Sequence, residues 1–336
     1  MRSVTTYVVA CVLFIAIGVA FDGASDAIAA GGNTQSWDLS GVKEIDIDGV
    51  SGDVVIVPTD EGKGSIELRS DVHPQDAFEP VVNRRGSDLR ISEKFHGNSS
   101  GPIRWTIHLP KTEKAPWIRI SNASGNLECA DIAVGISYRT ASGDVELSSV
   151  TLQADSKFES ASGDFTIRGM TVNEDSRFNT ASGDLVLEDL IIENDARFST
   201  ASGDIRIAGC TSGDDVSYSS ASGDVEVRSI ELAGESTFSS ASGDVEVRFD
   251  RLSKTGFTAS SASGDVTLKV NEFGDDFTLV MIKRKTKGKI SCPFDYTDQG
   301  EFEEHGQTYQ SKIVKRGSGK PVITLRTASG KVTVKD

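Results

Sequence analysis

The sequence predicts an all-β fold, a parallel β-solenoid built of coils of about 20 residues. The tetrapeptide Ala-Ser-Gly-Asp occurs seven times between residues 141 and 265, with five steps of 20 residues and a last step of 21. In six copies an aromatic residue stands three positions before the alanine, and apolar and polar residues alternate after the aspartate, which is typical of strands. A repeat of 20 residues is too short to bury its apolar side chains alone and can bury them only against the adjacent repeats. We therefore expect stacked coils.

Each repeat contains an aromatic residue that we expect in the core and a glycine that we expect in a turn. We expect the aromatics to form an inward-facing stack, because each ring can bury about 150–250 Å². They are Tyr138, Phe158, Phe178, Phe198, Tyr218 and Phe238. We expect the glycines to occupy sharp turns, where glycine accepts a positive φ. They are Gly143, Gly163, Gly183, Gly203, Gly223, Gly243 and Gly264. The general chirality of parallel β connections favours right-handed coils.

The first residues, 1–29, are typical of a secretory signal peptide. Arg2 supplies a positive charge, residues 8–21 form a short apolar run, and Ala27-Ile28-Ala29 matches a cleavage site with small residues. We therefore expect export and a mature chain that begins near Ala30, with no membrane span after cleavage.

The repeats divide the mature chain into three parts. Residues 30–120 are predicted to be an N-terminal β cap with irregular coils, with strands at 44–48, 54–57, 65–68, 89–91 and 103–107. Residues 121–270 form the regular solenoid. Residues 271–336 form C-terminal coils and a cap, with a closing coil at 322–334. The basic run at 283–289 is interpreted as a solvated strand edge that discourages aggregation, and contact with an anionic membrane surface is the alternative.

Charge and cysteine content exclude several functions. The 336 residues carry 50 Asp and Glu against 35 Lys and Arg, a net charge of −15, which argues against binding to nucleic acid. Cys129, Cys210 and Cys292 remain after cleavage, an odd number that argues against a disulfide framework. Cys129 and Cys210 stand at positions that are apolar in other repeats, so we expect buried thiols. No haem, zinc or other cofactor is predicted.

A column of aspartates accounts for part of the negative charge. Its members are Asp144, Asp164, Asp184, Asp204, Asp224, Asp244 and Asp265. Stacked carboxylates repel one another, so they need either hydrogen bonds from turn amides or bound cations. Asn126 and Lys331 fill the same position in outlying copies, which a required calcium ligand would not allow. We therefore predict a structural turn and no metal site, with these aspartates as weak calcium candidates.

Two further functional readings stay open as alternatives. Parallel β-helices can act on acidic polysaccharides, but the carboxylates here are uniform, without the local break that an active site would make. Pairs of hydroxyls flank the repeated alanine, as at Thr140 and Ser142 or Ser160 and Ser162, and an outward-facing array of them would suit ice. Strict alternation from Phe158 instead places both hydroxyls inward, unless a bulge reverses the turn.

The repeated Ser-Gly-Asp-Val turns, Ile107-His108-Leu109-Pro110 and the terminal 327–332 segment resemble a bacterial putative-adhesin family of domains of unknown function. The resemblance spans essentially the whole mature chain. It implies an exported, envelope-associated protein that is not an enzyme, and it supplies no catalytic residues.

We therefore expect a structural or interaction module, in the periplasm, on the cell surface or outside the cell. Its repetitive face would bind an unknown envelope or surface protein or glycan at many equivalent points.

Overall fold

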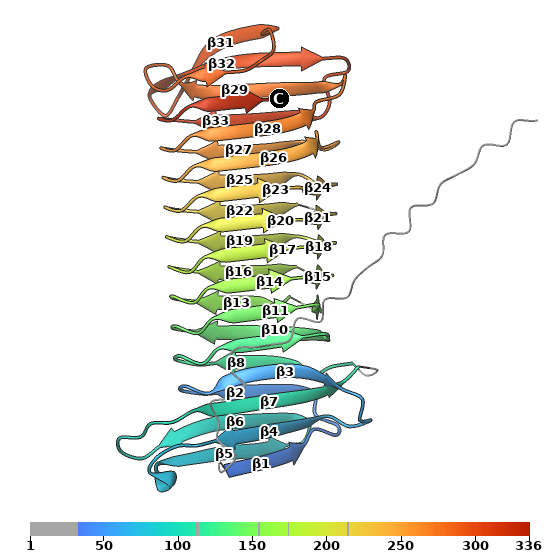
Figure 1. Ribbon diagram of the computed structural model, residues 1–336, viewed down its shortest axis with the longest axis vertical. Helices are drawn as coiled ribbons and strands as arrows, with labels where there is room; N and C mark the ends of the chain where they lie inside the picture. Colours follow the sequence, from blue (N-terminus) through green and yellow to red (C-terminus); the bar gives the residue numbers. More distant parts are fainter. Residues whose placement is uncertain (1–32, 112–113, 154, 174, 214) are drawn as a thin grey trace, which may run out of the picture.

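A computed structural model describes residues 33–111, 114–153, 155–173, 175–213 and 215–336. The predicted signal peptide, 1–29, lies outside these residues. The described chain consists of strands and one 3-10 turn, η1 (Gln75–Ala77). Figure 1 shows the strands stacked in a tall column, with the N-terminal strands at one end and the C-terminal strands at the other. The predicted all-β solenoid is confirmed.

Three parallel sheets run along the column. Sheet 1 contains β10 (Ala133–Thr140), β13 (Lys157–Ser160), β16 (Ser176–Thr180), β19 (Ala196–Thr200), β22 (Val216–Ser220), β25 (Ser236–Ser240), β27 (Phe257–Ser261) and β33 (Val322–Thr327). Sheet 2 contains β9 (Leu127–Ala130), β11 (Val145–Ser148), β14 (Phe165–Arg168), β17 (Leu185–Glu188), β20 (Ile205–Ala208), β23 (Val225–Arg228), β26 (Val245–Arg251), β28 (Val266–Glu272) and β34 (Val332–Lys335). Sheet 3 contains the short strands β12 (Thr151–Leu152), β15 (Thr171–Val172), β18 (Ile191–Ile192), β21 (Thr211–Ser212) and β24 (Glu231–Leu232).

A column of aromatic rings runs through the largely aliphatic core, one ring for each coil from Phe158 to Phe238. Phe158 pairs in register with Phe178, and Phe178 with Phe198. The five rings from Phe158 to Phe238 stack with centroid distances of 4.9, 4.8, 5.1 and 5.4 Å, and each is at most 2% exposed. At about 25 cal/mol per Å² of buried apolar surface, this column is a main source of stability. Tyr138 is also buried and donates its hydroxyl to the carbonyl of Gly125 at 2.6 Å.

The repeated glycine lies at the first corner of each coil, between sheets 1 and 2. Gly163 and its counterparts in the repeat do not have a positive φ, so the reason predicted from the sequence was wrong. A Cβ atom on Gly163 would lie 1.8 Å from the carbonyl oxygen of Gly143, so the close approach of adjacent coils requires glycine. Positive φ angles occur at the second corner, between sheets 2 and 3, for example at Gly169 and Asp189.

At the N-terminal end, the strands do not stack in chain order. β2 (Glu44–Asp48) lies between β6 (Asp88–Phe95) and β8 (Trp117–Ser121). β3 (Asp53–Thr59) likewise lies between β7 (Ile103–Pro110) and β9. The Ser51-Gly52-Asp53 turn is therefore a full level of the stack. Antiparallel strands β1 (Asn33–Asp38), β4 (Ser65–Ser70) and β5 (Phe78–Arg85) cover this end.

The C-terminal end is built in a similar way. β33 lies between β27 and β29 (Phe277–Arg284), and β34 lies between β28 and β30 (Ile290–Ser291). The predicted closing coil is thus a parallel level within the stack, and the parallel strands β29 and β30 form a further level beyond it. The antiparallel hairpin of β31 (Asp298–Glu304) and β32 (Gln307–Arg316) continues beyond β29.

This arrangement corrects the interpretation of the basic run at 283–289. Its first two residues belong to β29, which pairs with β32 on one side and β33 on the other and is not an edge. Lys283 is 8% exposed, and its Nζ donates to the carbonyls of Arg284 and Lys285 at 3.2 and 3.1 Å. Lys285 forms an ion pair with Glu301 at 2.7 Å.

No helix in the described part of the chain has the length and apolar character needed to cross a membrane.

Candidate functional site

At each first corner, one hydroxyl links successive coils inside the column. Ser160 Oγ accepts the amide of Gly163 at 2.8 Å and donates to the carbonyl of Gly143 at 3.2 Å. The same two bonds occur at Thr180, Thr200, Ser220, Ser240, Ser261 and Thr327. This column of hydroxyls is buried, as strict alternation predicted.

The second hydroxyl of each pair has a different position. Ser162 is exposed, and its Oγ donates to the carbonyl of Ala141 at 3.2 Å. Of the two facings that the sequence left open for Ser162, the structure has the outward one, because the chain leaves the strand at Ala161 and strand alternation no longer applies. The two hydroxyls of a pair do not form one outward-facing array.

The aspartates form a continuous hydrogen-bonded ladder. Oδ1 of Asp144 accepts the amide of Asp164 at 2.9 Å, and the same bond joins each following pair as far as Asp265. Asn126 takes the position before Asp144, and Asp265 accepts the amide of Lys331 at 2.7 Å. Within the described residues, no group of three or more His, Cys, Asp or Glu side chains is placed to hold a metal ion.

On the outer face of sheet 2, charged side chains form ion pairs with side chains of opposite charge on neighbouring coils. Arg168 contacts Glu188 at 2.8 Å, and Lys269 contacts Glu246 at 2.9 Å. Arg206 lies opposite Glu226 in the register, but its ion pairs are with Asp184 and Asp204 of the ladder. Such exposed pairs favour solubility and contribute little to stability.

The outer face of sheet 1 changes along the column. One row in register carries long polar side chains in the first coils, then four serines, then an arginine. Its members are Arg139, Glu159, Asn179, Ser199, Ser219, Ser239, Ser260 and Arg326. Replacement of long side chains by serine lowers the surface over the last coils.

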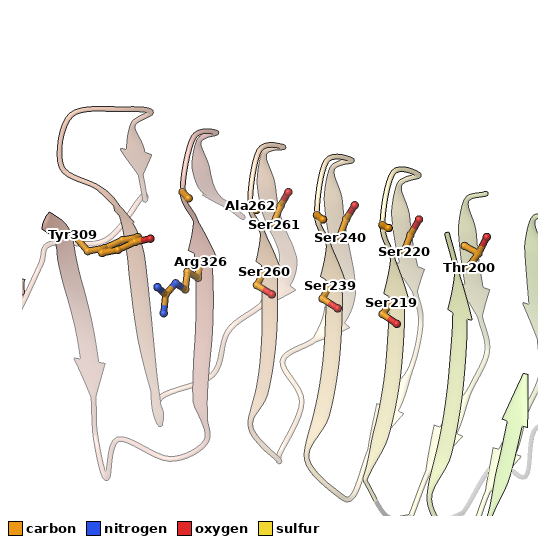
Figure 2. Close-up of a pocket in the computed structure, with 13 residues that line it drawn as sticks. Thr200, Ser219, Ser220, Ser239, Ser240, Ser260, Ser261, Ala262, Tyr309 and Arg326 are labelled. Atoms are coloured by element: carbon orange, nitrogen blue, oxygen red, sulfur yellow. The ribbon is translucent and has the colours of Figure 1, made fainter. Parts of the chain in front are cut away.

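A groove of about 580 Å³ occupies this lowered surface. Figure 2 shows Ser219, Ser239 and Ser260 in a row along the coils, with Tyr309 and Arg326 at one end. Small side chains from the first corners line the rest, namely Thr200, Ser220, Ala221, Ser240, Ala241, Ser261, Ala262 and Ala328. None of these lining residues is acidic, although the chain as a whole is strongly acidic.

The end wall of the groove is fixed by contacts from the hairpin. The guanidinium carbon of Arg326 lies 4.7 Å from the centroid of the Tyr309 ring, and Phe302 stacks on the same ring at 5.6 Å. Arg326 also forms an ion pair with Glu304, and its hydrogen bond lowers the pKa of that carboxyl. The one charged residue lining the groove is therefore neutralised by an adjacent carboxylate.

Sequence reasoning did not identify this groove. The change from long side chains to serine at positions 199, 219, 239 and 260 was a readable signal, because these positions alternate with the buried aromatics. The approach of Tyr309 was not readable, since it depends on the insertion of β33 before the β31–β32 hairpin.

None of the cysteines and histidines in the described part of the chain lines the groove. Cys129 and Cys210 are buried, and burial raises the pKa of the Cys210 thiol to about 12. Cys292 is half-buried in the C-terminal cap. His73 contacts Asp71 at 3.3 Å and His96 contacts Glu79 at 3.5 Å, both on the surface of the N-terminal cap.

The chain matches a model of a known protein family. The family model described as Toastrack DUF4097 matches residues 42–289. No curated protein matches the chain.

Several solved structures are similar over most of their length. A putative adhesin from Bacteroides fragilis NCTC 9343 is 13% identical, with a TM-score of 0.40, and the match covers 92% of this chain and 98% of the other. A putative adhesin from Parabacteroides distasonis ATCC 8503 is 15% identical, with a TM-score of 0.37 and coverage of 90% and 96%. A putative cell adhesion protein from Clostridium sporogenes ATCC 15579 is 10% identical, with a TM-score of 0.19 and coverage of 90% and 99%.

Proposed function

Because the chain belongs to the Toastrack DUF4097 family and stacks its coils in register, we propose that it is an exported, non-enzymatic binding module of the bacterial cell envelope or surface. The observation that carries this proposal is the alignment of residues 20 positions apart in neighbouring strands. Equivalent positions recur at every coil, 4.8 to 5.4 Å apart as measured between the core rings, and four successive positions on the outer face of sheet 1 carry serine. A repetitive partner can therefore make the same weak contact several times, and the contacts add through avidity.

The outer face of sheet 1 is the surface best suited to this role. The charges of sheet 2 are already paired, whereas the serine row of sheet 1 presents small hydroxyls that both donate and accept hydrogen bonds. The stacked core keeps this row straight, since interiors packed in this way deform little.

The alternative of an enzyme acting on acidic polysaccharides has less support from the groove. General acid–base cleavage of a glycosidic bond uses a pair of carboxyl groups, and the groove lining contains none. The proposal of a binding module is tested against this alternative by incubating the protein with uronic-acid polymers and calcium. Release of new reducing ends would contradict it.

Binding is tested by sedimenting the full chain with an isolated cell-envelope fraction. Single replacements Ser219→Ala, Ser239→Ala and Ser260→Ala should each weaken binding by at most about tenfold, the value of one hydrogen bond. The triple variant should weaken it by more than any single one. If one of these alanine replacements abolishes binding, a single focused site acts and the multivalent proposal fails.

Deletion of residues 201–220 provides a second test of multivalency. The deletion joins Thr200 to Ala221, the same step that the repeat makes at Thr200–Ala201, so the register is preserved. The shortened rod should remain folded and should bind the envelope fraction more weakly. Unchanged binding would show that the number of coils does not matter.

Export is tested by fractionation of the native protein and sequencing of its N-terminus. We expect the protein outside the cytoplasm, with a first residue near Ala30. A full-length chain in the cytoplasm would contradict the proposal.

A further inference from the structure

We propose that the groove on sheet 1 binds a neutral, extended β-linked glycan that runs along the solenoid axis with one sugar ring for each coil. This inference rests on the proposed function, because it names the chemistry of the partner that the repetitive face would hold. Three features of the groove carry it: its lining, its period and its closed end.

The lining matches an uncharged ligand rich in hydroxyl groups. The accessible floor consists of the half-buried Ser219, Ser239 and Ser260 and of the corner alanines, because the corner hydroxyls from Thr200 to Ser261 are buried and bonded to the backbone. The one charged lining residue, Arg326, is paired with Glu304. An anionic ligand would meet one positive charge in the groove, that of Arg326, which Glu304 already neutralises. The net charge of −15 would also repel it. Serine hydroxyls can donate to and accept from sugar hydroxyls, and the alanine methyl groups offer an apolar surface for the C–H face of a pyranose ring.

The period of the groove selects a glycan over a peptide. Successive coils lie 4.8 to 5.4 Å apart between ring centroids, and Ser219, Ser239 and Ser260 repeat with the coils. The advance per ring of an extended β-1,4-linked pyranose chain is close to this distance, so each ring can meet a serine. Alternate rings are turned over, so the same ring face returns at every second coil and stays in step with the groove. In an extended peptide, side chains on one face repeat at about 6.6 Å, which falls out of step within two coils.

The groove is closed at one end by polar groups. Arg326 continues the serine row at the next level, and the Tyr309 hydroxyl points toward the groove in Figure 2. The Tyr309 side chain is buried, with Phe302 and Arg326 packed against its ring, so the ring does not offer a stacking platform. The wall therefore acts as a polar stop for the end of a chain, and the single row of Ser219, Ser239 and Ser260 supplies the contacts along its length.

The test measures binding of β-1,4-linked glucose and N-acetylglucosamine oligosaccharides, from disaccharides to octasaccharides, to the full chain by isothermal titration calorimetry. Affinity should rise with length and level off near the four levels from Ser219 to Arg326. Ser239→Arg fills the groove and should weaken binding of the longest oligosaccharide by at least about tenfold. Thr166→Arg, on the outer face of sheet 2 beside Glu146, is the matched control and should bind as the wild type does.

Other outcomes would overturn the inference. Binding that does not depend on length, or equal binding of the coiled α-1,4-linked oligosaccharides, would contradict the match of periods. If no oligosaccharide binds but the envelope fraction still binds and Ser239→Arg abolishes that binding, the glycan chemistry is wrong and the proposed function stands. If the envelope fraction does not bind either, the proposed function itself fails. Circular dichroism confirms that both arginine variants are folded.

Discussion

Oδ1 of Asp164 accepts a hydrogen bond from the backbone amide of Asp184, 2.8 Å away. The same bond repeats along the ladder, so the carboxylates stand one coil apart. Two like charges at about 5 Å repel by about 0.8 kcal/mol in water, which is close to the net value of about 1 kcal/mol for one hydrogen bond. The hydrogen bond that each Oδ1 accepts therefore roughly offsets the repulsion between neighbouring carboxylates. The ladder is stabilised by the acceptor oxygen and gains nothing from the negative charge.

Replacement of a ladder aspartate separates these two effects. Asp164→Asn keeps the acceptor and removes the charge, as Asn126 does in the natural ladder, so its urea midpoint should equal or exceed that of the wild type. Asp164→Ala removes the acceptor and should cost about 0.5–1.5 kcal/mol. Unfolding in urea followed by circular dichroism measures both. If Asp164→Asn costs as much as Asp164→Ala, the negative charge itself, and hence a bound cation, is required.

The repeated glycine should tolerate no side chain. A Cβ atom on Gly203 would lie 1.9 Å from the carbonyl oxygen of Gly183, so Gly203→Ala must push two coils apart. We expect a loss of at least about 3 kcal/mol, the upper range of overpacking. Gly62→Ala is the control, since nothing lies within 4 Å of its Cβ and it does not need a positive φ. Thermal melting compares the two, and similar melting temperatures would contradict the close-approach argument.

Much of the fold was predictable because the 20-residue spacing of the repeat determines which residues of successive coils are in contact. A residue and its counterpart 20 positions on must be neighbours once coils stack, which placed Phe158 on Phe178 and Asp144 beside Asp164. The resemblance to the putative-adhesin family, drawn from the same repeated turns, is confirmed by the Toastrack match.

The sequence did not reveal contacts between segments that do not follow the 20-residue spacing. β2 and β33 are inserted between strands distant in the chain, and no local pattern marks that pairing. The groove depends on this insertion, because Arg326 belongs to β33 and Tyr309 to the hairpin beyond it. The facing of Ser162 stayed open for a different reason, since alternation holds in strands but not at a corner.

Glu93 should act as the cap of the first corner column. Its Oε2 accepts the amides of Val50 and Ser51 at 2.7 and 3.2 Å, in the place of a carbonyl from a preceding coil, and its Oε1 accepts Trp105 Nε1 at 2.9 Å. Glu93→Ala leaves these donors without the carboxylate, at a cost of about 1–3 kcal/mol for each one that stays buried.

The effect of this replacement should be local. Hydrogen exchange should accelerate at residues 44–59 more than in the coils after residue 140. The exposed Glu61→Ala serves as control and should exchange as the wild type does. A uniform loss of protection, or none at residues 44–59, would show that Glu93 does not cap this end.

Removal of one core ring should be costly. Phe198 is fully buried between Phe178 and Tyr218, so Phe198→Ala opens a cavity in the column and should cost about 3–5 kcal/mol. Ile191→Ala, at a side chain that is 51% exposed, should change the free energy of unfolding far less. Urea unfolding measures both, and a near-neutral Phe198→Ala would contradict the role of the ring column.

Acid should loosen the end wall of the groove before the coils unfold. The hydrogen bond from Arg326 lowers the pKa of Glu304 in the folded protein below its ordinary value of 4.5. A carboxyl with a lowered folded pKa contributes stability that is present above the ordinary value and lost as the pH falls through the folded value. Protonation therefore releases Arg326 from Glu304, and the β31–β32 hairpin should become less protected from hydrogen exchange below pH 4.5, after correction for the intrinsic rate. Glu304→Gln should show reduced protection already at neutral pH and no such acid step, whereas Glu303→Gln should behave as the wild type. An acid step that persists in Glu304→Gln would assign the transition to another group.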